Sequence, residues 1–268
     1  KLIMNILALS LLSIGFYTLG TFHQSLIYLR KIQNKPFISM LIGTIAVSSH
    51  ALIAYQQIFT DNEIILSFFN TASLVALFVI SGLIIFSARK PLQAVFIFCY
   101  PVAALSLISS LIFNNDIPAF NPENSGIFIH ITLSIISYSI FSIAVIQGIL
   151  VYMQNNNLKK RNHTVLLRNL PPLLTMENLL FEMIWSGTIL LGLAIIAGSL
   201  FVDNLFAQHL VHKTILSIIA FAIFSTLLAG RHFYGWRGLT ASKWTLWGFS
   251  FLLIGFFGSK LVLEQILK

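Results

Sequence analysis

The sequence has few charged residues. Only 9% of its 268 residues are Asp, Glu, Lys or Arg, whereas a soluble domain carries about 25%. Hydrophobic residues make up 57% of the chain, and phenylalanine alone occurs 24 times. A water-soluble fold of this size needs many more charges to cover its surface. The composition therefore excludes an ordinary soluble domain and predicts a multi-span membrane protein.

Cysteine and the familiar catalytic motifs are also scarce or missing. Cys99 is the only cysteine, which excludes a disulfide scaffold. The chain contains no His-Glu-x-x-His, no Gly-x-Ser-x-Gly and no phosphate-binding loop. We therefore expect a protein that is not an enzyme. The net charge of +8 does not indicate a nucleic-acid partner, because the basic residues lie at the ends of the predicted spans.

Eight apolar runs of about 20 residues predict membrane helices. Their bounds are Leu2–Leu29, Phe37–Phe59, Ile64–Phe86, Pro91–Phe113, Gly126–Met153, Leu179–Val202, Thr214–Phe233 and Trp244–Leu267. The connections are too short for a soluble domain. We expect an all-α, polytopic bundle of eight transmembrane helices that forms a single membrane domain over residues 1–268.

The distribution of basic residues predicts the orientation of these spans. Twelve of the sixteen Lys and Arg residues fall on the first, third, fifth and seventh connections. The even-numbered connections carry Asp and Glu, with Lys213 as their only basic residue. Because cytoplasmic loops are enriched in Lys and Arg, the odd-numbered connections are predicted to be cytoplasmic and both termini extracytoplasmic.

Three of the seven histidines are candidate ligands. His130 lies one turn inside the outer end of the fifth predicted helix, and His212 lies at the start of the seventh, on the same side of the membrane. His50 lies in the outer half of the second helix, about 13 Å deep at 1.5 Å per residue. A polar side chain at that depth needs a hydrogen-bond partner or a ligand. The other histidines are interpreted as ordinary polar groups: His23, His163, His209 and His232.

Two imidazoles brought to one face of the bilayer from separate segments suit axial ligation of a haem iron. A structural zinc site usually has several closely spaced Cys or His residues. Here only His209 and His212 are three positions apart, and no cysteine is near them. The chain also has no Cys-x-x-Cys-His motif, which excludes covalent attachment of haem. The alternative is that these histidines are buried or interfacial polar groups without a ligand.

Several short motifs in the second half of the chain resemble those of a known family. They are His130 with Tyr138, Leu170-Pro171-Pro172-Leu173 with Met176-Glu177, three glycines of the sixth span, His212-Lys213-Thr214, Gly235-Trp236-Arg237-Gly238, and the glycines of the eighth span. Together they resemble the cytochrome c assembly superfamily of eight-span membrane proteins. Within it, the chain is similar to the YpjD/HemX-like subgroup, which lacks the tryptophan-rich motif. The resemblance covers residues 126–264.

The resemblance implies a bacterial inner-membrane protein that handles haem and presents it at the outer face. It implies that His130 occupies the place of the first outer histidine, and more weakly that His212 is its counterpart. Members that present haem grip it with a tryptophan-rich outer loop, but residues 203–213 contain no tryptophan. Regulation, haem sensing or an assembly role are therefore alternatives to haem delivery. The two glycines of Gly235-Trp236-Arg237-Gly238 predict a tight reversal between two helices.

Two functions remain open from the sequence. In the first, the protein handles non-covalently bound haem, with His130 and His212 as candidate iron ligands and His50 as a third cofactor-binding candidate. In the second, it is a non-haem accessory or regulatory subunit of another membrane protein, such as an ion transporter. Both functions imply contact with membrane lipid. The first also implies partners among cytochrome assembly or transport proteins of the membrane.

Overall fold

The computed structural model describes residues 2–33, 35–60, 63–87, 90, 92–113, 125–159, 170–201 and 208–261. Eight of the helices within these ranges are long and apolar enough to cross a membrane, which confirms the predicted all-α membrane fold. The chain divides into two compact units, residues 1–121 and 122–268. The prediction of a single membrane domain over residues 1–268 is not settled by this division and stays a prediction.

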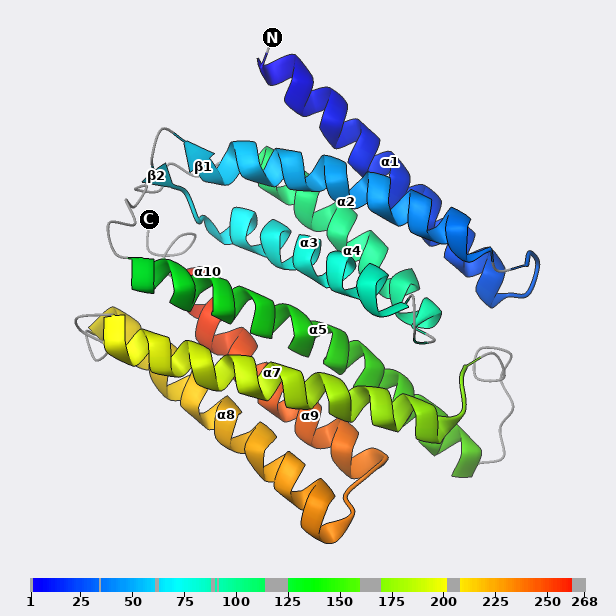
Figure 1. The fold of residues 1–268 in the computed structure, drawn as a ribbon, viewed down its shortest axis with the longest axis vertical. Helices are drawn as coiled ribbons and strands as arrows, with labels where there is room; N and C mark the ends of the chain where they lie inside the picture. The colour runs from blue at the N-terminus through cyan, green and yellow to red at the C-terminus, as the bar shows by residue number, and fades with distance from the viewer. Residues whose placement is uncertain are drawn as a thin grey trace. The chain divides into compact units, whose positions relative to one another are not determined.

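The first unit contains four helices and a minimal hairpin (Figure 1). The helices are α1 (Leu2–Tyr28), α2 (Pro36–Ile58), α3 (Phe68–Ser87) and α4 (Gln93–Ile112). Two short antiparallel strands, β1 (Phe59–Thr60) and β2 (Glu63–Ile64), join α2 to α3. Helix α1 packs on α2 and α4, and α3 packs on the same two helices. The four helices therefore form a closed ring in which each touches two neighbours.

The centre of the first unit is aromatic and polar. Tyr17 and Tyr100 are fully buried, and their ring centroids are 5.8 Å apart. The Tyr100 ring fills the space left by Gly20 of α1, where an added Cβ would lie 2.9 Å from its Cε2 atom. Cys99, the neighbour of Tyr100 in α4, is also buried. A glycine on α1 thus lets the largest side chain of α4 reach the middle of the ring.

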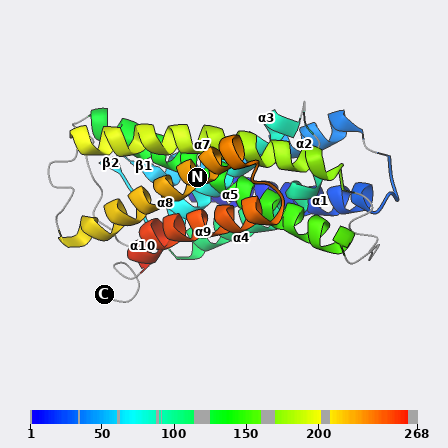
Figure 2. The ribbon, with the colours of Figure 1, turned by 90° about the horizontal axis from the view of Figure 1, so that it is seen from below.

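The second unit also contains four packed helices, of which three have 27 residues or more (Figure 2). Its helices are α5 (Ser125–Lys159), α7 (Leu173–Phe201), α8 (Gln208–Tyr234) and α9 (Leu239–Leu253), followed by the π-helix η1 (Ile254–Gly258) and α10 (Ser259–Leu261). Helix α5 packs on α7 and α9, and α8 packs on the same two helices. Helices α5 and α8 therefore face each other across the ring.

A pair of phenylalanines fills the centre of the second unit. Phe141 of α5 and Phe224 of α8 stack with ring centroids 3.9 Å apart and an interplanar angle of 12°. An added Cβ at Gly187 of α7 would lie 2.9 Å from the Phe141 ring, and one at Gly248 of α9 would lie 2.7 Å from the Phe224 ring. The stacked side chains connect α5 to α8 across the centre of the four-helix ring. Gly187 of α7 and Gly248 of α9 leave the space that the two phenyl rings occupy.

Polar side chains of α5 bond to backbone carbonyls of α7 and of Pro171, which lies just before α7. Ser137 Oγ donates to Gly187 O at 3.0 Å, Gln147 Nε2 to Met176 O at 3.2 Å, and Gln154 Nε2 to Pro171 O at 3.0 Å. Each pair keeps the same antiparallel register. These bonds fix the position of α5 against α7. His130 lies at the far end of the same contact, so its position relative to α7 is fixed as well.

The ends of several helices differ from the predicted spans. Helix α7 begins at Leu173, directly after Pro171-Pro172, whereas the sixth span was predicted from residue 179. Helix α5 extends to Lys159 rather than residue 153, and α8 begins at Gln208 rather than residue 214. Hydropathy marks only the apolar part of a helix, and backbone hydrogen bonding continues through polar flanks. His209 and His212 consequently lie within α8, not in the predicted outer connection.

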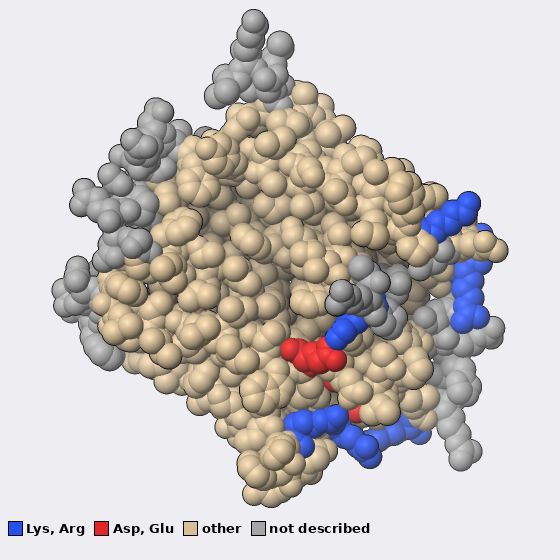
Figure 3. Space-filling view, viewed as in Figure 1, with Lys and Arg blue, Asp and Glu red and all other residues tan. Residues whose placement is uncertain are grey.

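Uncharged side chains dominate the face shown in Figure 3. In the first unit Arg30, Lys31, Lys35 and Lys90 lie where α1 and α3 end and α2 and α4 begin. In the second unit Lys159, Arg231, Arg237 and Lys243 lie at the corresponding helix ends. This end of each unit is the predicted cytoplasmic one. The orientation itself stays a prediction.

The predicted tight reversal joins α8 to α9. Gly235 and Gly238 have φ values of +65° and +58°, the left-handed region that favours glycine. The Trp236 backbone N–H donates to Gly230 O at 3.1 Å, and its indole packs on Trp244 with ring centroids 5.1 Å apart. The other two tryptophans, Trp185 and Trp247, also belong to this unit. The prediction of a glycine-enabled reversal is confirmed.

Candidate functional site

His130 is held by a single strong hydrogen bond at the α5–α7 contact. Its Nδ1 lies 2.7 Å from the backbone oxygen of Ala194 in α7. A carbonyl oxygen only accepts, so Nδ1 carries the proton and donates it. In a neutral imidazole the lone pair then resides on Nε2. Histidines that bind a metal commonly use their second ring nitrogen in this way, which fixes the ring and its tautomer.

A glycine on α7 provides the space for the His130 ring. An added Cβ at Gly198 would lie 2.9 Å from both Cε1 and Nδ1 of His130, and 3.7 Å from Nε2. The ring therefore rests edge-on against the α7 backbone, with Nε2 as the ring nitrogen farther from Gly198. Gly198 and Ala194 are one helical turn apart, so α7 supplies both the hydrogen-bond acceptor and the gap. The arrangement fixes the ring through Nδ1 and leaves the lone pair on Nε2.

His212 has a different environment. It lies in the second turn of α8 and is exposed. Helix α8 faces α5 across the ring, with α7 and α9 between them. Between the described residues His130 and His212, the structure records no hydrogen bond and no ring contact. The predicted pair thus lies in one unit and on opposite helices of its ring, but the rings are not brought into contact.

His50 has both ring nitrogens occupied by protein groups. Its Nδ1 lies 2.9 Å from the hydroxyl of Tyr17 in α1, and its Nε2 lies 2.8 Å from Oγ of Ser73 in α3. The His50 side chain is fully buried, and the Tyr17 ring meets it edge-on with centroids 5.7 Å apart. One nitrogen of the neutral ring accepts and the other donates. His50 therefore links α1, α2 and α3 of the first unit, while His130 and His212 belong to the second.

Neither His23 nor His232, the other two histidines whose side chains the structure describes, has a comparable arrangement. His232 of α8 is exposed and meets the Phe233 ring edge-on, with centroids 4.8 Å apart. His23 of α1 has a buried Nδ1 without a hydrogen-bond partner. His209 lies in α8, and His163 lies outside the described residues. Among the residues described, no three His, Cys, Asp or Glu side chains gather as a potential metal site. A zinc-type site therefore has no candidate there.

Sequence reasoning missed the groups that define these environments. Tyr17, Ser73 and Ala194 belong to no motif with a known role. Gly198 is one of the three glycines noted in the sixth span, but its contact with the His130 ring was not predicted. Tyr138 had been noted only for its spacing from His130. Its hydroxyl is buried without a partner, and its ring packs on Phe249, Phe256 and Phe257. The small residues spaced along the sixth span were the one available signal for close packing against α5.

Comparison with known proteins decides the family. A family model described as "Cytochrome C assembly protein" matches residues 38–267. The chain belongs to this family. The match runs from the start of α2 to the end of the second unit. It includes most of the first unit, whereas the sequence resemblance rested on residues 126–264. The expected membership in the cytochrome C assembly family is confirmed.

Several curated proteins are similar to this member of the cytochrome C assembly family. "Inner membrane protein YpjD" of Escherichia coli is 27% identical over 230 residues, which cover 85% of this chain and 87% of that protein. "Protein HemX" of Brevibacillus brevis is 32% identical over 131 residues, or 48% of each chain. No solved structure matches the chain. With its eight candidate spans, the chain is a multi-pass protein of the bacterial inner membrane.

Proposed function

We propose that this protein handles non-covalently bound haem in the inner membrane and that His130 is an axial ligand to the iron. The observation that carries the proposal is the 2.7 Å hydrogen bond from His130 Nδ1 to Ala194 O. It fixes the ring and its tautomer and leaves the Nε2 lone pair available to a ligand. Membership in the cytochrome C assembly family supports haem as this partner. The role we propose is binding and transfer, not catalysis.

His212 is the proposed second ligand. Its exposed ring lies in the same unit as His130, on the helix that faces α5. Haem, if bound, would supply an iron that the imidazoles of His130 and His212 would hold. The protein's own contribution is to hold His130 in the Nδ1-protonated tautomer and to keep the His212 ring accessible. Other membrane proteins of cytochrome assembly are the proposed partners, as donors or acceptors of haem.

His50 takes a different part in the proposal. It can bind iron only by giving up its bond to Tyr17 or to Ser73. Breaking a buried hydrogen bond costs about 1–3 kcal/mol when the group is left unpaired. We therefore rank His50 behind His130 and His212 as a cofactor ligand. Both ring nitrogens of His50 have hydrogen-bond partners within the protein. This observation favours the alternative function, a non-haem accessory subunit whose histidines stabilise the fold.

Absorption spectroscopy of the purified protein tests the haem proposal. The detergent-solubilised protein is titrated with haemin, and its Soret band is compared with that of His130→Ala, His212→Ala and His232→Ala. We expect the first two variants to lose or shift the band and to bind haem at least tenfold more weakly. His232→Ala is the matched control, because His232 is also exposed on α8 but lies at the helix end opposite His212.

Two results would contradict haem binding at these histidines. One is a parent protein that leaves the absorption spectrum of free haemin unchanged. The other is a Soret band that His130→Ala and His212→Ala leave unchanged. If these substitutions also leave cellular cytochrome c levels intact, the accessory-subunit function replaces the haem-handling one. Far-ultraviolet circular dichroism of each variant distinguishes loss of the ligand from loss of the fold.

A further inference from the structure

The interior of the first unit is polar at membrane depth. On α1 the described buried polar side chains are Ser10, Ser13, Tyr17 and Gln24, and none is more than 4% exposed. Their spacing of three, four and seven positions places them on one face of the helix. This face extends over about 21 Å from Ser10 to Gln24 at 1.5 Å per residue. The hydrocarbon core of a bilayer is about 30 Å thick, so the polar face reaches through most of it.

A four-helix ring does not itself require a polar centre. The second unit has the same order of helix contacts around its ring, and its centre is filled by the stacked rings of Phe141 and Phe224. Polar groups at membrane depth are costly, and they commonly mark pathways for ions or protons. The polar centre of the first unit therefore indicates a function in addition to packing.

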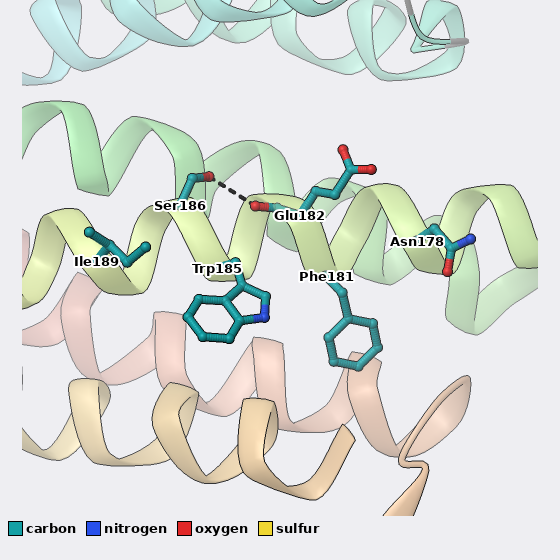
Figure 4. Close-up of a pocket in the computed structure, with 6 residues that line it drawn as sticks. All are labelled: Asn178, Phe181, Glu182, Trp185, Ser186 and Ile189. Atoms are coloured by element: carbon teal, nitrogen blue, oxygen red, sulfur yellow. Dashed lines mark hydrogen bonds between the residues drawn. The ribbon is translucent and has the colours of Figure 1, made fainter. Parts of the chain in front are cut away.

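The polar groups of the surface hollow on α7, in the second unit, are arranged differently (Figure 4). The hollow is lined by Asn178, Phe181, Glu182, Trp185, Ser186 and Ile189. Ser186 Oγ donates to the Glu182 carbonyl of the same helix at 3.0 Å, and Asn178 Oδ1 accepts from Arg231 at 3.3 Å. Both bonds are exposed, whereas the two side-chain bonds of His50 are buried. The His50 chain is thus enclosed by its unit, as a path through the membrane requires.

His50 connects the polar face of α1 to α3. Its partners are the hydroxyls of Tyr17 and Ser73, and a hydroxyl can both donate and accept a hydrogen bond. Neutral imidazole donates through one ring nitrogen and accepts through the other. Each member of the chain Ser73–His50–Tyr17 can therefore receive a proton on one side and release one on the other. This is the property that a proton shuttle needs, and histidine commonly supplies it.

Polar groups continue from this chain toward both ends of the unit. Asn70 and Thr71 are buried in the first turn of α3, at its predicted outer end. Toward the predicted cytoplasmic end, the Gln24 side chain is 3% exposed, and its Oε1 has no hydrogen-bond partner within the protein. The Nδ1 atom of the adjacent His23 is likewise buried without a partner. Both groups can bind water, which extends a hydrogen-bonded chain.

The composition of the helices favours the proton over a larger ion. Between their first and last residues, α1, α2, α3 and α4 contain no Asp, Glu, Lys or Arg. No fixed charge of these helices therefore compensates a metal cation or an anion inside the ring. The buried titratable groups of the ring are His50, Tyr17, Tyr100 and Cys99, and all of them exchange protons.

We propose that Ser73, His50 and Tyr17 carry protons across the membrane through the first unit, and we name these three residues the proton relay. Ser73 gives its hydroxyl proton to His50 Nε2 and takes up another from the outer side. The imidazolium releases its Nδ1 proton to the Tyr17 oxygen, and Tyr17 passes its own proton toward Gln24. His50 is then neutral again with the proton on Nε2, and rotation of the ring resets it. No electron is transferred, and the relay does not depend on haem.

Proton flux into proteoliposomes tests the proton relay. Full-length protein without haem is reconstituted in phosphatidylcholine vesicles that contain potassium and the pH-sensitive dye pyranine. Valinomycin then sets an inside-negative potential, and we expect the lumen to acidify faster than in protein-free vesicles. Tyr17→Phe and His50→Gln should each return the rate to that of protein-free vesicles. Phenylalanine lacks the hydroxyl, and the glutamine amide can make two hydrogen bonds but does not pass on a proton.

Matched variants assign the flux to the relay. Tyr55→Phe removes an exposed hydroxyl from α2 of the same unit, and His232→Gln removes an exposed imidazole from α8, so both should keep the parental rate. A parental rate equal to that of protein-free vesicles would overturn the proposal, as would a rate that Tyr17→Phe or His50→Gln leaves unchanged.

A solvent isotope effect decides the case in which both relay variants fail to fold. The parental flux is then compared in H₂O and D₂O. Proton hopping along a hydrogen-bonded chain is slower with deuterium, and equal rates would refute the relay. Because haemin is absent from these measurements, their outcome is separate from that of the haem titration.

Discussion

At the scale of single residues, two histidines of one chain have opposite hydrogen-bonding environments. The described structure records one hydrogen bond to the His130 ring, from Nδ1 to the Ala194 carbonyl, whereas both nitrogens of His50 have partners, Tyr17 and Ser73. A buried imidazole with two partners stabilises its surroundings, because no polar atom is left unpaired. In an imidazole with one partner, that hydrogen bond fixes the ring, and the other nitrogen can still bind a second partner. The distinction depends on the neighbours and not on depth in the membrane.

Removing the Ser73 hydroxyl should destabilise the first unit. Ser73→Ala leaves one nitrogen of the fully buried His50 without a partner, which costs about 1–3 kcal/mol. We expect a lower thermal unfolding midpoint by circular dichroism in detergent. Ser81→Ala is the matched control on the same helix, because the Ser81 hydroxyl bonds only to the Leu77 carbonyl of its own helix. Equal midpoints for the two variants would show that the His50 bond to Ser73 contributes nothing.

The sequence identified the histidines but not their partners. The depth of His50 in a predicted span correctly required a hydrogen-bond partner or a ligand. Tyr17 and Ser73 lie 33 and 23 positions away, and their contact with His50 depends on how three helices pack. No sequence motif can indicate the Ala194 carbonyl as a partner, since every residue has a backbone carbonyl. Which neighbour a helix turns toward is decided by tertiary packing, and the local pattern does not contain it.

At the scale of helices, the α5–α7 contact combines side-chain hydrogen bonds with glycines that allow close packing. Within a membrane, association of helices relies on close packing and hydrogen bonds, because lipid is as apolar as the helix surface. Gly187 and Gly198 accept Phe141 and His130, and the carbonyls of α7 accept bonds from Ser137 and Gln147. The same contact that holds the helices together also positions the proposed iron ligand.

A methyl group at Gly248 should disturb the aromatic centre of the second unit. The added Cβ would lie 2.7 Å from Cζ of Phe224, which is stacked on Phe141 and cannot easily move. Overpacking of this kind costs about 1–3 kcal/mol. We expect Gly248→Ala to lower the unfolding midpoint. Gly15→Ala is the control, because no atom lies within 4 Å of an added Cβ there; it should leave the midpoint unchanged or raise it, and a similar loss in both variants would contradict the steric explanation.

All eight helices were predicted from apolar runs, because a membrane helix has to be apolar over its whole crossing. The ends were predicted less well. Residues 173–178 include Thr175, Glu177 and Asn178, so hydropathy places them outside the span, although they continue α7 without interruption. The short β1–β2 hairpin was not predicted at all, because two-residue strands have no periodicity to detect.

At the scale of the whole molecule, each unit is a closed ring of four helices, and its basic residues concentrate at one end. Helical hydrogen bonding satisfies most backbone groups inside a span, and charge at the ends is the main determinant of orientation. The predicted topology has both termini extracytoplasmic. The division into two units could not be predicted from the eight spans, since their spacing along the chain shows no interruption that separates the first four from the rest.

Accessibility of single cysteines in intact cells tests the predicted topology. In a Cys99→Ser background, Asn115→Cys lies on a predicted outer connection and Gln33→Cys on a predicted cytoplasmic one. A membrane-impermeant maleimide should label Asn115→Cys in intact cells and label Gln33→Cys only after permeabilisation. The reverse pattern would show that the protein has the opposite orientation and would move His130 and His212 to the cytoplasmic side.

The lone cysteine and the four tryptophans fall in different units: Cys99 is buried in the first, and Trp185, Trp236, Trp244 and Trp247 all lie in the second. The natural chain therefore contains two independent reporters. The rate of thiol alkylation follows opening of one half, and indole emission follows opening of the other. A single heating or denaturant series on unmodified protein can thus reveal whether the halves melt together or one after the other.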